Sequence, residues 1–467
     1  MNINSGQMEL FLNAVSKLVW GWPLIIFIVG TGVYFSFRLG LLSFSKLRLS
    51  LKYAIAENIS GKTGPGNISI FASLCTSLSA TIGVGNIVGI AVAIAVGGPG
   101  SLFWLWVSSL FSLALKYSEG VLAVKYRKVE KNGNVSGGPM YYIHMGLNNG
   151  FLAKVFAFFG MMVALIGIGT IAQSNSIAVT LSSFGTSSIV TTIMLVIVVG
   201  MVTMGGLRRI STVAEKVVPL MTIFYIGAAT LVLAVNITRL PSLLYSIVCS
   251  AFSPKSILGG GTGITATIAA SVGASRGIFS HEAGLGSAAI AAATAKTNSP
   301  GMQGLVSMAG ALLSVIVCTM TGLVILIATD RSSPLEGAML TSQAFAHGLG
   351  MPELGKIIVG FSIILFAFTT IIGWNYYGEQ CAKFLFGHKA IVPYKILFIF
   401  FVAIGPFFRI NAILSLADIV TGFMAIPNLI GLVGLRNVIL QETNMFFRVR
   451  KNIADNINDT SKLGTMR

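Results

Sequence analysis

Long apolar stretches follow one another along the whole chain, and this repetition constrains the fold more than any other feature of the sequence. A helix needs about 20 apolar residues to cross the hydrocarbon core of a bilayer. No stretch shows the ~10-residue alternating pattern of a transmembrane barrel. The sequence therefore predicts an all-α polytopic membrane protein. Its eleven candidate transmembrane helices lie at approximately 17–37, 68–96, 100–124, 151–181, 187–206, 213–236, 263–295, 302–328, 357–384, 391–408 and 411–435.

The composition excludes several other classes of protein. Only 10% of the 467 residues are charged, compared with about 25% in an ordinary soluble domain, which excludes soluble enzymes and disordered chains. The formal charge of +17 comes from basic residues spread between the spans, without the interleaved aromatic residues of a nucleic-acid interface. The four cysteines form no C-x-x-C pair and have no spacing matched to the histidines, so neither a disulfide framework nor a zinc site is indicated.

The positions of Lys and Arg predict the orientation, because cytoplasmic loops carry the positive excess. Starting outside and crossing eleven times places 23 of the 31 basic residues on one side and six on the other. We therefore expect a multi-pass protein of the cell membrane with its N-terminus outside and its C-terminus in the cytoplasm. The first span should be retained, since no clear small-residue cleavage site follows it. Residues 437–467 are predicted to form a solvated, partly disordered cytoplasmic tail.

Two of the spans are interrupted at their centres by small and polar residues, at 77–89 and 274–287. If residues 1–40 are set aside as an extra N-terminal helix, the other ten spans divide into two repeats of five, 65–240 and 241–436. Interrupted helices at matching positions predict an inverted-repeat transporter with its binding site near the midplane. The alternative is that the glycines only permit close helix packing.

An unwound helix offers two kinds of backbone group to a ligand. The N–H groups that open the second half-helix suit a carboxylate, and the carbonyls that close the first half-helix suit a small cation. An anionic group and a cation can therefore be bound side by side without a charged side chain.

Six motifs between about residue 65 and residue 380 carry a family resemblance. They are Thr81-Ile-Gly-Val-Gly-Asn-Ile, Gly97-Gly-Pro-Gly-Ser-Leu-Phe-Trp104, Lys116-Tyr-Ser-Glu119, Ser136-Gly-Gly-Pro-Met-Tyr-Tyr142, Gly277-Ile-Phe-Ser-His-Glu-Ala-Gly-Leu-Gly-Ser287 and Thr369-Thr-Ile-Ile-Gly-Trp-Asn-Tyr-Tyr-Gly-Glu379. With these motifs the chain resembles the sodium:alanine symporter family, also called the alanine or glycine:cation symporters. The resemblance implies a five-plus-five inverted-repeat, LeuT-like fold and the transport of small neutral amino acids with Na⁺.

The same resemblance implies a substrate site between the two interrupted spans. Backbone N–H groups of the first would bind the amino-acid carboxylate, and carbonyls of the second would accept from its ammonium group. The Gln173 amide would bond the substrate or, alternatively, another helix, and Trp374 would limit the size of the substrate side chain. The substrate-binding residues are then Thr81, Gly83, Gly85, Asn86, Gln173, Phe279, Ser280 and Trp374.

The resemblance also implies a Na⁺ site, and a hard cation prefers oxygen ligands. Thr369 and Thr370 lie on the span that supplies two hydroxyl groups in sodium-coupled relatives, and carbonyls near Ala80 and Gly83 would complete the shell. Paired threonines are also common where helices pack, so this alternative stays open. No other metal and no cofactor is implied.

Three residues depart from the family pattern. His281 stands where Asn is expected, Thr170 where Asn precedes the Gln, and Asn375 where Ser follows the Trp. Because histidine titrates near neutral pH, His281 would make transport sensitive to pH or involve a proton, unless it only hydrogen-bonds as Asn would.

Ionisable residues inside spans are costly, so they are functional candidates. Lys116 and Glu119 share one helix face and are expected to pair. The others would form gates or static pairs whose partners the sequence does not assign; they are Arg276, Glu282, Glu379 and Asp418.

These observations predict a secondary active symporter that imports alanine and glycine with Na⁺ by alternating access. The alternatives are a proton-coupled amino-acid symporter and a channel. An ATP-driven pump is disfavoured by the lack of a G-x-x-x-x-G-K-[ST] loop and of a soluble domain of sufficient length, and an enzyme is disfavoured because the chain has no H-E-x-x-H motif. The expected partners are the amino acid, Na⁺ and the bilayer, with no nucleic acid and no obligate protein partner.

Overall fold

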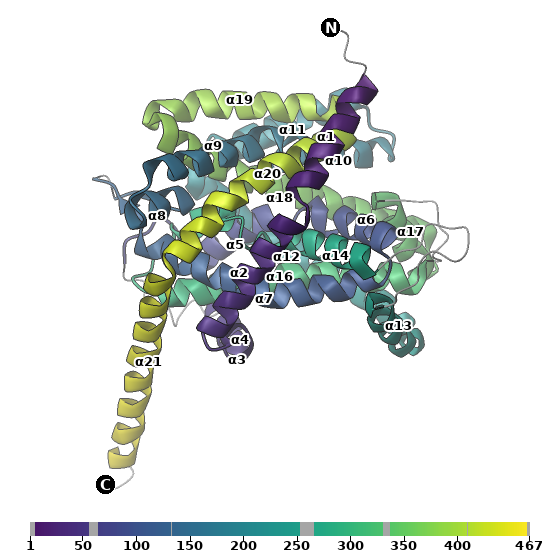
Figure 1. The fold of residues 1–467 in the computed structure, drawn as a ribbon. Helices are drawn as coiled ribbons and strands as arrows, with labels where there is room; N and C mark the ends of the chain where they lie inside the picture. Colours follow the sequence, from purple (N-terminus) through teal and green to yellow (C-terminus); the bar gives the residue numbers. More distant parts are fainter. Residues whose placement is uncertain are drawn as a thin grey trace.

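A computed structural model describes residues 5–55, 64–131, 133–252, 266–329, 337–408 and 410–464. In this part of the chain nearly every element is a helix, which confirms the predicted all-α membrane class (Figure 1). The exception is a short antiparallel hairpin of β1 (Lys128–Val129) and β2 (Val135–Ser136).

Eight predicted spans correspond to a single long helix each, although several begin or end a few residues away from the predicted bounds. These helices are α2 (Trp22–Arg38), α7 (Gly100–Lys125), α11 (Ser188–Thr203), α12 (Gly206–Val235), α16 (Pro300–Ala328), α18 (Pro352–Phe386), α19 (Ile391–Ile404) and α20 (Ile410–Gly434).

Three predicted spans are each divided between two α-helices, and in the first of them a short 3₁₀ turn lies between the two. The two that the sequence marked as interrupted are α5 (Ile70–Thr81) with η1 (Val84–Asn86) and α6 (Val88–Gly97), and α14 (Ala266–His281) with α15 (Ser287–Ala292). The third is α9 (Gly150–Ile166) with α10 (Ile171–Ser182).

Shorter helices connect and flank these spans. They are α1 (Ser5–Val19), α3 (Leu42–Ser45), α4 (Leu47–Ile55), α8 (Pro139–Gly146), η2 (Ile237–Arg239), α13 (Leu240–Phe252), α17 (Gly337–Leu349), η3 (His388–Ala390) and η4 (Gly405–Phe407). The longest flanking helix is α21 (Arg436–Gly464), which projects away from the bundle at the C-terminus (Figure 1).

Over the described residues, eight helices are long and apolar enough to cross a membrane, and nine if the pair α5 and α6 is counted as one span bent by 66°. Two predicted spans fall outside this count. The helix α11 has only 16 residues, and the span predicted at 263–295 is split between α14 and α15, with 263–265 outside the described residues. The protein is therefore a multi-pass membrane protein, whereas the count of eleven stays a prediction.

The span predicted at 151–181 is confirmed as one membrane-crossing segment, Gly150–Ser182, but its helix is interrupted in the middle, which the sequence did not predict. The chain leaves the helix between Gly167 and Thr170, where the N–H groups of Gly167 and Gly169 both donate to the carbonyl of Val163. A methyl group at Gly169 would lie 2.7 Å from Cβ of Trp374, so glycine permits the close approach of α18 at this break. A predicted span of 31 residues was already longer than a membrane requires.

The C-terminal tail also differs from the expectation of a partly disordered end, because it is helical over Arg436–Gly464. The first half of α21 packs on the bundle. The Phe446 ring lies 6.2 Å from that of Tyr53, and the Glu442 carboxylate pairs with Lys125 at 2.6 Å. These contacts offset the polarity of the tail and hold its first turns in a helix.

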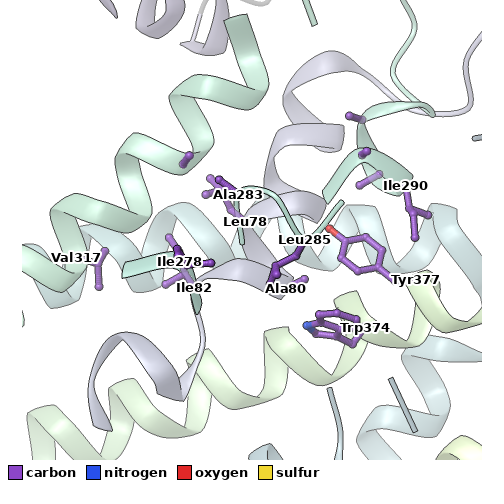
Figure 2. Packing of buried hydrophobic residues seen from close by; sticks show 14 of the residues in the cluster. Leu78, Ala80, Ile82, Ile278, Ala283, Leu285, Ile290, Val317, Trp374 and Tyr377 are labelled. Carbon is purple, nitrogen blue, oxygen red and sulfur yellow. The ribbon is translucent and has the colours of Figure 1, made fainter. Parts of the chain in front are cut away.

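The buried core surrounds the broken helices. Figure 2 shows Ala80 of α5, Leu285 of the break between α14 and α15, and Trp374 and Tyr377 of α18 within one cluster of buried apolar residues. Large apolar side chains on the outside, such as Ile223 on α12 and Val235 at its end, are exposed. Such a surface suits contact with lipid rather than with water.

Candidate functional site: three helix breaks

The first break frees two backbone carbonyls because side chains take the N–H groups that would normally reach them. The Gly83 N–H donates to Oδ1 of Asn86 at 3.1 Å, and the Val84 N–H donates to Oε1 of Gln173 at 3.4 Å. In a continuous helix these two donors would bond the carbonyls of Ser79 and Ala80. Those carbonyls at the end of α5 therefore lack their usual helical donors, whereas the Gly83 carbonyl accepts from the Asn86 N–H at 3.1 Å.

The hydroxyl group of Thr370 faces this break. A methyl group at Gly83 would lie 2.6 Å from Oγ1 of Thr370. The Thr370 hydroxyl donates to the Phe366 carbonyl of its own helix at 2.8 Å, which leaves its oxygen free to accept or to coordinate. One turn further along α18, a methyl group at Gly373 would lie 2.9 Å from the backbone nitrogen of Ala80. The structure thus brings Ala80, Gly83 and Thr370 together.

Thr369 occupies a different face of α18. Its hydroxyl lies 3.5 Å from Sδ of Met221 on α12 and donates to the carbonyls of Leu365 and Phe366 at 3.1 and 3.0 Å. Consecutive residues of a helix point about 100° apart, and in this conformation only the Thr370 hydroxyl faces Gly83.

Gln173 joins the first break to the break between α9 and α10. While its Oε1 accepts from Val84, its Nε2 donates to the carbonyl of Ile168 at 3.0 Å. Its amide therefore bonds the backbone of both breaks. Trp374 lies against Gly169 in the break between α9 and α10. The indole of Trp374 is buried, and its N–H lies within reach of the Glu282 carboxyl group.

Gly85 lies at an open position in the first break. It is exposed, and a methyl group at this residue would meet no atom within 4 Å. Its N–H donates to no other described group. An open space beside an unpaired N–H group that precedes α6 is the arrangement expected for a carboxylate site.

A hydrogen-bond chain connects the two interrupted helices through α16. Nδ2 of Asn86 donates to Oγ of Ser314 at 2.8 Å, and Oγ of Ser314 donates to the carbonyl of Ser280 at 2.6 Å. The Asn86 amide thus holds the break with its oxygen, which accepts from Gly83, and with its nitrogen, which donates to Ser314. Sequence reasoning missed Ser314, since a serine inside an apolar span carries no distinguishing signal.

Two predicted substrate residues point elsewhere. The Thr81 hydroxyl donates to the Ser77 carbonyl of its own helix at 2.6 Å. The Phe279 ring packs against Trp20, at 4.2 Å between ring centroids, and beneath the guanidinium of Arg276 at 5.6 Å. Trp20, at the kink between α1 and α2, is another residue that the sequence did not mark.

The second interrupted helix is held open by Glu119 of α7. Its Oε1 accepts from the N–H groups of Gly284 and Gly286 at 2.9 and 3.1 Å, and from Nδ2 of Asn428 at 2.9 Å. Its Oε2 lies 3.7 Å from Nζ of Lys116, which confirms the predicted i, i+3 pair. A protein carboxylate thus occupies the N–H groups that precede α15, where a helix start favours an anion.

Glu282 begins this break in an unusual conformation. It is one of the few non-glycine residues with a positive φ, +52°, a region that L-residues rarely occupy. Nζ of Lys116 donates to its carbonyl at 3.0 Å, and the Ser287 hydroxyl donates to its carboxyl group. These contacts hold the backbone where the sequence predicted an unwound helix.

The other buried charges have structural partners. Glu379 pairs with Lys395 of α19 at 3.2 Å, and Lys395 also donates to the Thr203 carbonyl at 3.0 Å. The Asp418 carboxylate accepts from the Ser16 hydroxyl at 3.2 Å and lies in the electrostatic reach of Arg276. These contacts fasten α18 to α19 and α1 to α20.

A cluster of charged residues lies beside the β1–β2 hairpin. Glu130 pairs with Lys383 at 2.6 Å and with His388 at 3.3 Å. Partial burial opposes the effect, but the hydrogen bonds and positive charges of Lys383 and His388 lower the pKa of the Glu130 carboxyl. Nearby, the Arg127 guanidinium donates to three carbonyls that follow α15, those of Ala293, Ala295 and Thr297. The cluster therefore ties the end of α15 to that of α7.

Comparison with known proteins decides the class of this site. The profile of the sodium:alanine symporter family matches residues 5–460. The chain belongs to this family. It is 46% identical over 444 residues to an uncharacterized transporter of Haemophilus influenzae, with 94% of this chain and 96% of that one covered.

Two further relatives have names that state a substrate. The chain is 42% identical to the sodium/alanine symporter AgcS of Methanococcus maripaludis, over 95% of this chain and 98% of that one. It is 35% identical to the probable sodium/glutamine symporter GlnT of Bacillus subtilis, over 95% and 92%. As a member of the family the protein is a sodium-coupled amino-acid symporter, not an enzyme.

Proposed function

We propose that this chain imports small neutral amino acids, alanine and glycine, together with Na⁺ by alternating access. The observation that carries this proposal is the first break, which holds freed carbonyls and the unpaired Gly85 N–H and which the Thr370 hydroxyl of α18 faces. Oxygen ligands suit Na⁺ and an unpaired N–H suits a carboxylate, so the coupling ion and the substrate would bind side by side.

For the cation we propose the carbonyls of Ala80 and Gly83 and the hydroxyl groups of Thr370 and Thr369. The close approach of Thr370 to Gly83 supports the Thr370 hydroxyl as a ligand. Thr369, which faces Met221, would reach the ion only after a change of rotamer.

For the substrate we propose the first break together with Gln173, Ser280 and Trp374. The bonds of Gln173 to two breaks support its place at this site, and the burial of Trp374 beside Gly169 supports its role as a wall. Phe279 would contribute its backbone carbonyl, because its ring packs on Trp20. Thr81 and Asn86 would shape the unwound segment.

We further propose eleven spans in the five-plus-five inverted-repeat arrangement, with an extra N-terminal helix, the N-terminus outside and the C-terminus in the cytoplasm. The interrupted helices at the start of each proposed repeat support this arrangement. The two interrupted helices, α5 with α6 and α14 with α15, would rock together with α7 and α16 against the remaining helices. This movement would expose the site to each side in turn.

Removing the Thr370 hydroxyl tests the cation site. We expect Thr370→Ala to lower the apparent affinity for Na⁺ at least tenfold, because a coordinating oxygen is lost while the side chain remains small. The measurement is uptake of labelled alanine into proteoliposomes as a function of external Na⁺, with an inward proton gradient as the comparison. Thr369→Ala, measured in parallel, should have a smaller effect.

Ser362→Ala provides the matched control for the two threonine variants. Ser362 is buried on the same helix and bonds the carbonyl four residues before it, as Thr370 does, but it lies two turns away. Equal losses in Thr370→Ala and Ser362→Ala would contradict the site. Uptake driven by the proton gradient alone would contradict Na⁺ coupling in this chain.

Shrinking Trp374 tests the substrate class. We expect Trp374→Leu to raise the kcat/KM for glutamine relative to that for alanine at least tenfold, since pocket volume discriminates by about 1–3 kcal/mol per methylene. Competition between labelled alanine and unlabelled glutamine measures the ratio. Tyr376→Leu, which changes a buried aromatic residue on another face of α18, should leave the ratio unchanged. A ratio that is unaffected by Trp374→Leu would contradict the wall.

A further inference from the structure

Four ionisable side chains meet where α14 ends, and their charges do not balance. Lys116 and Glu119 come from α7. His281 is the last residue of α14, and Glu282 follows it in the break before α15. Each of the four is no more than 2% exposed. Charges buried this deeply inside a membrane require compensation by an opposite charge. Here one lysine faces two carboxyl groups. The net charge of the network therefore depends on which of the carboxyl groups and the imidazole carry a proton.

His281 supplies no positive charge to this network. Its Nδ1 accepts a hydrogen bond from the Ala283 N–H at 3.1 Å, so this nitrogen carries no proton. An imidazolium would have a proton on both ring nitrogens. The neutral ring therefore holds its proton on Nε2, which has no hydrogen-bond partner among the described residues.

Glu119 is the ionised carboxylate of the pair. Its Oε1 accepts three hydrogen bonds, from Gly284, Gly286 and Asn428, and its Oε2 faces the Lys116 ammonium. All of these neighbours are donors, and a carboxylate that accepts several hydrogen bonds is stabilised in its charged form. Glu119 and Lys116 therefore compensate one another.

The carboxyl group of Glu282 forms no ion pair with any described residue, although the Lys116 ammonium acts on it from a distance. Lys116 reaches the backbone carbonyl of Glu282 instead of its carboxyl group. The Ser287 hydroxyl, which can accept as well as donate, bonds this carboxyl group, and the indole of Trp374 also lies within its reach. We propose that the Glu282 carboxyl group is a proton-binding site and holds a proton in this conformation, so that the network of Lys116, Glu119 and Glu282 is neutral.

The surroundings favour a proton over a second metal ion. The Lys116 ammonium already lies beside the break and would repel another cation. Among the described residues no group of three His, Cys, Asp or Glu side chains could hold a metal. The remaining polar groups that face the network are uncharged: Tyr142 of α8, Trp374 and Tyr377 of α18, and Asn428 of α20.

This proton lies next to the proposed substrate site. The Glu282 carboxyl group lies beside the indole of Trp374, and the Glu282 backbone is held at positive φ. Loss of the proton would place an uncompensated negative charge at the hinge of α14 and α15. The inference extends the proposed function, because it concerns a third bound species in addition to Na⁺ and the amino acid.

Infrared spectroscopy of the purified, full-length protein tests the site without relying on transport. A protonated carboxylic acid has a carbonyl stretch that a carboxylate lacks and that shifts on exchange into deuterium oxide. We expect the wild-type spectrum at neutral pH to contain such a band that Glu282→Gln removes. Asp418→Asn is the matched control, since Asp418 lies outside the network, and it should retain that band. Absence of a Glu282 band at neutral pH would overturn the proposal.

Two further measurements keep the test decisive. Ser287→Ala removes the hydrogen-bond partner of the Glu282 carboxyl group, so it should shift the band without abolishing it; an unchanged band would contradict the assignment. The spectra are also recorded in sodium chloride and in choline chloride. A band present in choline chloride and lost in sodium chloride would assign the site to Na⁺ and overturn the proposal. Because no substrate is present, failure of the proposed alanine transport would leave this result intact.

Discussion

Gly83→Ala is expected to reduce Na⁺-driven alanine uptake by one to two orders of magnitude. The added methyl group would lie 2.6 Å from Oγ1 of Thr370, closer than van der Waals contact allows. Inserting a methyl group into a filled site costs about 1–3 kcal/mol. Since the Gly83 backbone has φ of −124°, which alanine adopts freely, the effect would come from space alone. Initial rates of uptake in proteoliposomes, normalised to reconstituted protein, measure it.

Gly85→Ala is the matched control, because the two glycines lie two residues apart in the same break. A methyl group at Gly85 would meet no atom within 4 Å. It should therefore leave the fold and the Na⁺ dependence unchanged, and it should lower uptake only if the bound substrate fills that space. Full activity of Gly83→Ala would show that Thr370 and Gly83 do not form a site in the transporting protein.

Glu119→Ala is expected to destabilise the folded protein by about 3–5 kcal/mol, the range measured when one partner of a buried ion pair is removed. The variant would leave Lys116 without a counter-ion and would leave the N–H groups of Gly284 and Gly286 without an acceptor. Thermal unfolding in detergent, followed by the loss of helical signal, measures the change. We also expect a strongly reduced yield of folded protein.

Glu442→Ala provides the comparison. It breaks the ion pair of Glu442 with Lys125, whose side chain is 44% exposed. Pairs that reach solvent contribute about 1 kcal/mol or less. Equal shifts in the unfolding temperature of the two variants would show that Glu119 does not support the second break as the contacts indicate.

The interrupted helices illustrate how much local sequence can predict. Glycine and small polar residues in the middle of an apolar span weaken the helix, so the breaks at 82–87 and 282–286 could be located from composition alone. The break at 167–170 was missed, although Gly167 and Gly169 supply the same signal, because the flanking apolar run resembles one long helix.

The site residues divide in the same way. Gly83 and Thr370 were predicted from their motifs, and they lie together. The sequence could not separate Thr370 from Thr369, since the face of α18 that meets α5 depends on how the two helices pack. It also gave no reason to select Ser314, whose partners Asn86 and Ser280 lie 228 and 34 positions away, or Trp20, whose partner Phe279 lies in another span.

The sequence by itself determined that this protein is a helical membrane protein with interrupted spans, because apolar length and glycine placement act on each segment separately. Only the tertiary structure decided which groups complete each break. In a bilayer a freed N–H or carbonyl must find a partner within the protein or line a polar cavity. Those partners, such as Gln173 for Val84 and Glu119 for Gly284, come from helices that are distant in sequence and meet only when the bundle has packed.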